Sequence, residues 1–223
     1  KVILMSHMGR PNGKEEQLSL RVVMRILEKQ LPGVPLKFVA ETTGPEVKTV
    51  VEELPEGGVL LLENLRFSPE EKQNSKEFAK EIVKATGATL FVQDGFAVTH
   101  RAHASTQAIA ELLPAVAGLL LEKEVKMLRS AVEDPKHPFV VIIGGAKVED
   151  KQPLIDEFLP IADRIIIGGK IAADGYCSKP KQIYVAEDFD EDGEGGKLDV
   201  GPVATAKVVD MVNGARTVLW NGT

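Results

Sequence analysis

The fold class follows from one stretch of the sequence, GVLLLENLRFSPEEKQNSKEFAKEIVKATGATLFVQD, at residues 58–94. It contains a short aliphatic run at 58–64, a segment of helical period at 69–86 and a second apolar run at 88–94. A strand, a helix and a further strand in this order are typical of a parallel sheet, whose strands need a crossover connection. We therefore expect an α/β fold with helices covering a parallel sheet.

The same alternation extends to both sides of this stretch. Before it we expect strands at 2–5 and 36–39 and helices at 20–31 and 45–54. After it we expect a long amphipathic helix at 118–134, strands beginning near 139, 164, 182 and 217, and helices over 152–162 and after Gly201-Pro202. The pattern predicts two doubly wound, Rossmann-like parallel-sheet lobes joined by a helix and hinge, with lobes at 1–117 and 136–223 and the joining helix at 118–135.

Composition limits the classes of partner. The chain has 223 residues, 43% of them hydrophobic, and its 27 Lys and Arg against 33 Asp and Glu give a net charge of −6. An acidic chain of this kind gives no reason to expect a nucleic acid or a membrane surface as partner. The single cysteine, Cys177, cannot form an intramolecular disulfide, which favours a cytoplasmic protein, and no apolar run is long enough to predict a membrane span.

Basic side chains follow three predicted strands of the first lobe. They are His7 and Arg10 after the first strand, Arg66 after residues 58–64, and His100, Arg101 and His103 after residues 88–94. Ligands of open parallel sheets bind at the carboxyl ends of the strands, and arginine matches phosphate and carboxylate oxygens. We therefore expect a cationic site for an anion of more than one charge.

A metal site is the alternative interpretation of the histidines. It would need carboxylate or thiolate neighbours, and only Asp94 lies close in sequence. Arg101 between the two histidines disfavours a divalent cation, so we expect no metal site here. Any one of the arginines taken alone could also be an ordinary solvated surface residue.

Glycine pairs follow two strands of the second lobe. Gly144 and Gly145 precede Ala146 and Lys147, with Lys151 one helical turn further on. Small residues let backbone N–H groups approach phosphate, and lysines add charge, although a glycine pair alone is often structural. The spacing matches neither a Walker A loop nor a dinucleotide fingerprint, which argues against a nicotinamide-dependent dehydrogenase.

The glycine pattern repeats further along the second lobe. Gly168 and Gly169 follow the next strand, and Gly201 precedes a proline suited to a first helical turn. Glycine at successive strand ends favours a nucleotide site. The stretch DFDEDGEGGKLD at 188–199 has the acidic spacing of a calcium loop, but Asp199 stands where such loops have glutamate, so an acidic surface loop is expected.

These motifs together resemble the phosphoglycerate kinase family. The matching stretches are SHMGRPNG, TTGPEV, LLLENLRF, DGFAVTHRAHAST, GGAKVEDK, IIGGKIA, LDVGP and VLWNGT, in the family's order. The resemblance implies reversible phosphoryl transfer between 1,3-bisphosphoglycerate and ADP, giving 3-phosphoglycerate and ATP, by a cytoplasmic monomer that binds Mg²⁺ with its nucleotide.

The resemblance also implies roles for individual residues. It implies that substrate is bound by His7, Gly9, Arg10, Arg66 and Arg101, that Lys147 is catalytic, and that nucleotide is bound by Gly144, Ala146, Lys147, Lys151, Gly168, Gly169, Gly201 and Asn221. No residue of the chain is implied as a metal ligand.

The sequence departs from the family pattern in several places. Lys170 and Ile171 stand where the family has a small residue and methionine, and the segment from Ala172 to Asp199 is short. The family's opening strand motif and its later glycine-rich loop, which holds the expected protein ligand of the Mg-nucleotide, have no counterpart here. The alternative hypothesis is therefore an anion- or nucleotide-binding fragment without useful turnover.

Overall fold

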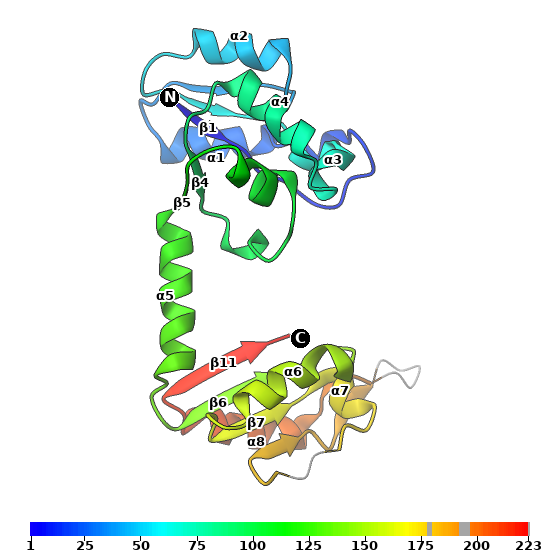
Figure 1. Ribbon diagram of the computed structural model, residues 1–223. Helices are drawn as coiled ribbons and strands as arrows, with labels where there is room; N and C mark the ends of the chain where they lie inside the picture. The colour runs from blue at the N-terminus through cyan, green and yellow to red at the C-terminus, as the bar shows by residue number, and fades with distance from the viewer. Residues whose placement is uncertain (178–179, 192–196, 223) are drawn as a thin grey trace. The chain divides into compact units, whose positions relative to one another are not determined.

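The computed structural model describes residues 1–177, 180–191 and 197–222. The chain forms two compact units, Lys1–Glu124 and Val125–Thr223. Each is built on parallel strands with helices packed against them (Figure 1). The α/β fold with parallel sheets that the sequence predicts is therefore confirmed. Helix α5 (Leu119–Glu133) begins in the first unit and ends in the second.

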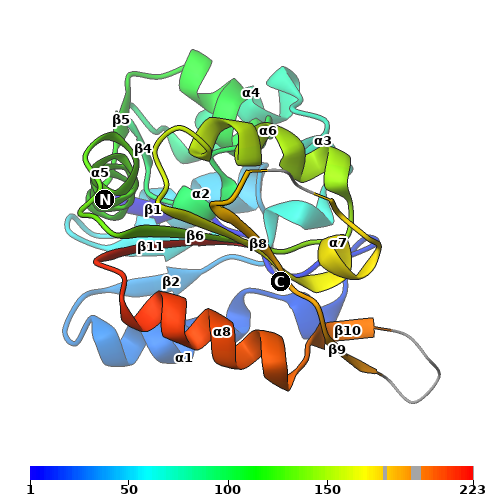
Figure 2. The ribbon, with the colours of Figure 1, turned by 90° about the horizontal axis from the view of Figure 1, so that it is seen from below.

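The first unit contains a three-stranded parallel sheet in the order β1-β3-β2. Its strands are β1 (Val2–Leu4), β2 (Leu36–Phe38) and β3 (Val59–Leu61). The helices α1 (Arg21–Gln30) and α2 (Pro45–Glu53) lie on opposite sides of this sheet (Figures 1 and 2). All three residues of β3 are buried, as expected of a central strand covered on both faces.

A second, two-stranded parallel sheet lies in the same unit. It pairs β4 (Phe91–Gln93) with β5 (Ala115–Ala117). The core of the unit joins Leu60 and Leu62 near β3 to Phe78 and Ile82 of helix α4 and to Phe91 of β4. The three basic strand ends of this unit therefore come from two sheets, because β4 is hydrogen-bonded only to β5 among the described strands.

The helix expected over 69–86 is divided into α3 (Pro69–Lys72) and α4 (Lys76–Thr86). Asn74 adopts a left-handed conformation with φ of 55° between them. Its Oδ1 accepts a hydrogen bond from Ala108 N at 3.1 Å, and Ser75 Oγ caps α4 by accepting from Phe78 N. A tertiary contact and a new N-cap thus end one helix and begin the next.

The second unit has a four-stranded parallel sheet in the order β11-β6-β7-β8. Its strands are β6 (Phe139–Ile143), β7 (Arg164–Ile167), β8 (Ile183–Val185) and β11 (Thr217–Asn221). Helix α6 (Val148–Phe158) lies on one side of it and α8 (Pro202–Asn213) on the other (Figure 2). Phe158 packs edge-on against Phe139, with ring centres 5.9 Å apart, in the core of the unit.

Two expectations about the second unit need correction. The helix predicted over 152–162 begins at Val148 and includes Pro153, which can donate no backbone hydrogen bond. The stretch 188–199 is not only a loop, because β9 (Phe189–Glu191) and β10 (Lys197–Val200) pair as antiparallel strands. The middle of that stretch, 192–196, lies outside the described residues. The short helix α7 (Gly169–Ala173) completes the unit.

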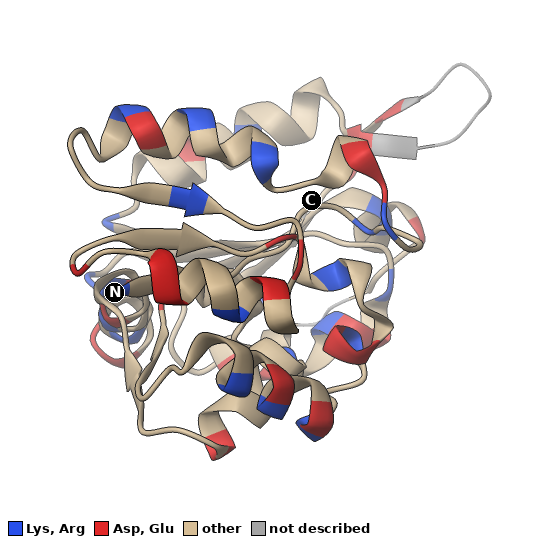
Figure 3. Ribbon diagram, turned by 90° about the horizontal axis from the view of Figure 1, so that it is seen from above, with Lys and Arg blue, Asp and Glu red and all other residues tan. Residues whose placement is uncertain are grey.

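Charged residues do not segregate by sign on the helices. Acidic and basic residues occur together on them (Figure 3), in keeping with the small net charge. No helix in the described part of the chain is both long and apolar enough to cross a membrane.

Candidate functional site

The carboxyl end of β3 organises the first unit's site through two buried polar residues. Glu63 is 6% exposed, and its carboxylate accepts hydrogen bonds from Ser19 Oγ at 2.7 Å, Leu20 N at 2.8 Å and Asn64 N at 2.7 Å. A buried carboxylate is tolerated when its oxygens are satisfied in this way. Glu63 therefore fixes the end of the long loop that follows β1.

Asn64 holds the other part of that loop and is fully buried. Its Nδ2 donates to Met8 O and to Leu18 O, both at 2.9 Å, while its Oδ1 accepts from Arg66 N at 3.1 Å. Arg66 in turn donates from Nη1 to Gly9 O at 2.8 Å. The segments that carry His7 and Arg66 are thereby fixed against each other.

Gly9 meets the geometric demand of this turn. Its φ is 65°, and a Cβ on it would lie 2.9 Å from Leu18 Cδ2. Glycine adopts such a conformation without strain, so its carbonyl can accept the hydrogen bond from Arg66.

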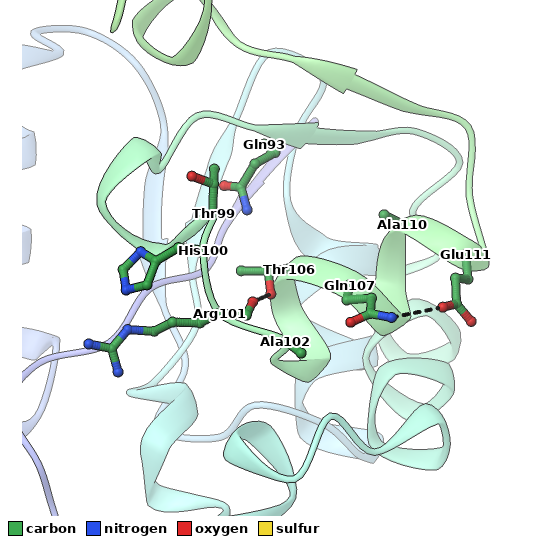
Figure 4. A pocket seen from close by; sticks show the side chains of 9 residues that line it. All are labelled: Gln93, Thr99, His100, Arg101, Ala102, Thr106, Gln107, Ala110 and Glu111. Atoms are coloured by element: carbon green, nitrogen blue, oxygen red, sulfur yellow. Dashed lines mark hydrogen bonds between the residues drawn. The ribbon is translucent and has the colours of Figure 1, made fainter. Parts of the chain in front are cut away.

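Arg101 comes from the segment after β4. Its carbonyl oxygen accepts from Thr106 Oγ1 at 2.7 Å, which fixes the backbone, while the side chain is exposed. The side chains of His100 and Arg101 extend to the same side, away from Gln107 and Glu111 (Figure 4). The bonded backbone and exposed guanidinium leave Arg101 available to an anion.

The basic side chains of the three segments converge, and we call His7, Arg10, Arg66, Arg101 and His103 the cationic cluster. Burial lowers the pKa of the Arg66 guanidinium, and the charges of Arg101 and Arg10 lower it further. Burial also lowers the pKa of His7, assisted by the charges of Arg66, His103 and Arg101. Mutual repulsion of this kind is relieved by an anion.

One nitrogen atom of the cationic cluster has no hydrogen-bond acceptor within the described part of the chain. Arg66 Nε is buried and has no hydrogen-bond partner among the described residues. A buried donor left unpaired is costly, and either a water molecule or a ligand oxygen can satisfy this one.

A pocket of about 570 Å³ opens beside Arg101. Its lining residues are Gln93, Thr99, His100, Arg101, Ala102, Thr106, Gln107, Ala110 and Glu111 (Figure 4). Glu111 is paired with Lys76 at 2.6 Å and Gln107 with Glu111 at 3.4 Å. Of the predicted residues, His100 and Arg101 line this pocket, whereas His103 is buried.

Asp94 connects the Arg101 segment to helix α5. Its Oδ1 accepts a hydrogen bond from Leu121 N at 2.9 Å, in the first turn of the helix. A Cβ at Gly118 would overlap the Asp94 side chain, so the two segments meet closely. The residue that follows β4 thus also caps the helix that leaves the unit.

The second unit's site begins at the carboxyl ends of β6 and β11. Gly144 N donates to Asn221 O at 2.9 Å, and a Cβ at Gly222 would overlap Gly144 O. Gly145 has a φ of 138°, which favours glycine. The two strand ends therefore pack backbone against backbone.

Both predicted lysines lie beside this loop. Lys147 is exposed and is the residue before α6, while Lys151 lies one turn further along that helix. Lys151 Nζ donates to Asn221 Oδ1 at 2.6 Å. Ala146 is exposed between the glycines and Lys147. A helix N-terminus with lysines beside it is suited to phosphate.

The next strand end lies against the same loop. Gly168 N donates to Ile143 O at 3.0 Å, and Ile171 N donates to Gly145 O at 3.1 Å. Gly169 has a φ of 58°. The predicted nucleotide-binding residues after β6, β7 and β11 are therefore adjacent.

Gly201 is brought toward this region by Asp188. The Asp188 carboxylate accepts from Val203 N at 2.8 Å and Ala204 N at 2.6 Å, which caps α8, and a Cβ at Gly201 would overlap it. A Cβ at Gly168 would lie 3.3 Å from Val200 Cγ1, so the residue before Gly201 touches the end of β7.

Sequence reasoning missed the polar residues that hold these segments in place. They are Glu63, Asn64, Glu71, Asn74, Asp94 and Asp188. No group of three or more His, Cys, Asp or Glu side chains suited to a metal ion is found within residues 1–177, 180–191 and 197–222.

The fold and these strand ends define an α/β protein of two parallel-sheet units with glycine-rich and basic loops. The sequence profile of the family described as phosphoglycerate kinase matches residues 1–191. The chain belongs to the phosphoglycerate kinase family.

Curated relatives support this assignment. The chain is 41% identical over 268 residues to "Phosphoglycerate kinase" of Moorella thermoacetica, covering 100% of this chain and 67% of that protein. It is 37% identical over 267 residues to "Phosphoglycerate kinase, cytosolic" of Nicotiana tabacum, covering 99% of this chain and 66% of that protein. The chain thus spans about two thirds of the length of these relatives.

Solved structures agree. Phosphoglycerate kinase from Coxiella burnetii matches with a TM-score of 0.67 and 30% identity, over 99% of this chain and 67% of that one. The enzyme from Pyrococcus horikoshii matches with a TM-score of 0.78 and 25% identity, over 100% of this chain and 68% of that one.

Proposed function

We propose that this chain binds the substrates of reversible phosphoryl transfer between 1,3-bisphosphoglycerate and ADP, the reaction that gives 3-phosphoglycerate and ATP. The observation that carries the proposal is the cationic cluster, in which basic residues from three segments converge in a member of the phosphoglycerate kinase family. Phosphoryl transfer depends mainly on positioning and charge neutralisation, which such residues supply.

The first unit is assigned to 3-phosphoglycerate, with residues 1–117 as the substrate lobe. The ligand carries a phosphate and a carboxylate, and both suit the planar fork of arginine. His7, Arg10, Arg66 and Arg101 would hold these groups, and Gly9 orients Arg66 through its carbonyl oxygen.

The second unit is assigned to ADP and ATP, with residues 136–223 as the nucleotide lobe and 118–135 as the joining helix. Lys147 and Lys151 lie at the N-terminal end of α6, where the helix dipole favours phosphate. Lys147 is exposed and is the N-cap residue of α6, so we assign it, as the family resemblance implies, to the transferred phosphoryl group. Gly144, Ala146, Gly168, Gly169, Gly201 and Asn221 would contact the nucleotide.

Mg²⁺ bound to the nucleotide supplies neutralisation of phosphate charge in reactions of this class. The described residues hold no group of three metal-ligating side chains, and Mg²⁺ in sites of this class is generally bound by substrate phosphates, waters and one or two carboxylates. A monomer in the cytoplasm remains a prediction.

Binding and turnover can be tested separately. Calorimetry should detect binding of both 3-phosphoglycerate and ADP. Arg66→Ala should weaken the binding of 3-phosphoglycerate about tenfold or more, since hydrogen bonds to charged groups contribute about 1.5–3 kcal/mol. Arg25→Ala, an exposed residue of α1, is the matched control. Absence of binding by either ligand would contradict the proposal.

A coupled assay then separates full catalysis from the alternative of a binding fragment without useful turnover. That alternative is motivated by the coverage of about two thirds of the relatives' length. Turnover abolished by Lys147→Ala would favour catalysis, whereas binding without turnover would favour the alternative.

A further inference from the structure

Glu71 is a buried carboxylate that lies between two arginine-bearing segments. It is 1% exposed and belongs to α3, which closely follows the turn that contains Arg66. Its Oε2 accepts a hydrogen bond from Ser105 N at 3.0 Å, and its Oε1 accepts from Ser105 Oγ at 2.6 Å. Ser105 follows Arg101 by four residues, so one carboxylate bonds the two segments together.

Glu71 also lies beside a histidine of the cationic cluster. His103 Nδ1 lies 3.6 Å from Glu71 Oε1. Burial, helped by the surrounding cations, lowers the pKa of Arg66 and of His103, and the charge of Glu71 opposes this shift in both. Glu71 is thus the buried counter-charge on the protein side of the cationic cluster.

A second contact joins the same segments. Asn74 Oδ1 accepts from Ala108 N at 3.1 Å, beyond the far end of α3. The segment after Arg66 is therefore attached at two points to the short π-helix Ala104–Ala108. With two attachments, the segment after Arg66 and the π-helix can neither separate nor rotate freely against each other.

We propose that Glu71 is a positioning residue, which sets the spacing between Arg66 and Arg101 for a ligand with two anionic ends. This inference rests on the proposed function, since it concerns recognition of 3-phosphoglycerate. Glu71 itself would not touch the ligand, because both oxygens are engaged with Ser105.

Two possible roles of Glu71 predict opposite effects of Glu71→Gln. If the carboxylate only lowers the local potential, its neutralisation should strengthen the binding of every anion. If Glu71 sets the spacing of the arginines, its neutralisation should selectively weaken the binding of 3-phosphoglycerate, because that ligand must reach Arg66 and Arg101 at once. Sulfate, a compact dianion, is the reference probe that needs no such spacing.

The test is calorimetric titration of 3-phosphoglycerate and of sulfate into the wild-type chain, Glu71→Gln and Glu70→Gln. Glu70 precedes Glu71 on α3, is exposed, and undergoes the same change of charge. We expect Glu71→Gln to raise the ratio of the dissociation constant of 3-phosphoglycerate to that of sulfate about tenfold or more, as for loss of charge-assisted bonds. Glu70→Gln should leave the ratio unchanged.

The inference is overturned if Glu71→Gln binds both anions equally well or more tightly, or matches Glu70→Gln. Should Glu71→Gln fail to fold, Ser105→Ala removes the 2.6 Å hydrogen bond and keeps the carboxylate. It should raise the same ratio, and an unchanged ratio would equally overturn the inference. If the wild-type chain itself does not bind 3-phosphoglycerate, the proposed function fails instead.

Discussion

Lys151 donates a hydrogen bond from Nζ to Asn221 Oδ1 at 2.6 Å, which joins α6 to the end of β11. The lysine is thereby held beside the loop at Gly144 and Gly145 rather than extended into solvent. The partner is a neutral amide, so an anionic phosphate would be a stronger acceptor for the same ammonium group.

We therefore expect Lys151→Met to weaken the binding of ADP about tenfold or more, because a charge-assisted hydrogen bond contributes about 1.5–3 kcal/mol. Calorimetry with ADP measures this effect. Lys181→Met is the control, since Lys181 is exposed and precedes β8 at the opposite edge of the sheet. Equal ADP affinities in the two variants would exclude Lys151 from the nucleotide site.

Arg66→Lys tests whether the cationic cluster works through geometry or through charge. Lysine keeps the charge but lacks the fork that reaches Gly9 O. We expect 3-phosphoglycerate to bind about tenfold more weakly, on the scale of a lost charge-assisted bond. Arg25→Lys on α1 is the control and should leave the affinity for 3-phosphoglycerate unchanged. If Arg66→Lys also kept the wild-type affinity, positive charge alone would be sufficient for binding.

The two histidines of the cationic cluster should make stability depend on pH. Burial first, then Arg66, His103 and Arg101, lowers the pKa of His7. For His103, burial and the charges of Arg66, Arg101 and Lys72 lower the pKa, and Glu71 opposes them. The unfolded chain then binds protons first, so the free energy of unfolding should decrease as pH falls below about 6.5. Denaturant titrations of wild type and His7→Asn/His103→Asn would measure the difference; an identical pH dependence would refute it.

Protonation of the two histidines, which should lower the stability of the fold, should by contrast strengthen the binding of sulfate. An anion in the cluster favours the protonated imidazoles and so raises their pKa. We expect proton uptake on binding, and sulfate affinity that rises as pH falls from about 7 through the histidine range. Calorimetry in buffers of different ionisation enthalpy counts these protons. Binding without proton uptake would place sulfate away from His7 and His103.

Asp188 should stabilise the second unit as the cap of α8. Its carboxylate accepts from two N–H groups of the first turn, and loss of such a cap costs about 0.5–2 kcal/mol. Thermal unfolding of Asp188→Ala should show a lower Tm than that of Asp190→Ala, an exposed residue of β9. Equal Tm values would show that the cap contributes nothing.

The sequence alone was sufficient for some strand ends and the residues after them, but it did not predict β5, β9 or β10. Strands such as β3 and β6 are continuous apolar runs between turn residues, so the positions of Arg66 and Lys147 followed from local pattern. The break between α3 and α4 did not follow, because Asn74 adopts its left-handed conformation against Ala108, 34 residues away.

The sequence did not predict the residues that support the site, for a related reason. Glu71 lies in the first turn of a helix, where an acidic residue is ordinarily an exposed partner of the helix dipole. Asp94 was considered only as a metal neighbour, whereas its bond is to Leu121 N. Such roles depend on which segments meet in the folded unit, and local sequence carries no signal of that.

The hydrogen bond from Leu121 N to Asp94 also makes this amide a built-in reporter. Asp94 begins the segment that leads to Arg101, and Leu121 lies in the first turn of α5. Exchange of the Leu121 amide proton with solvent requires that bond to open. Its exchange rate therefore registers the order of the Arg101 segment from a residue of helix α5, with no label attached.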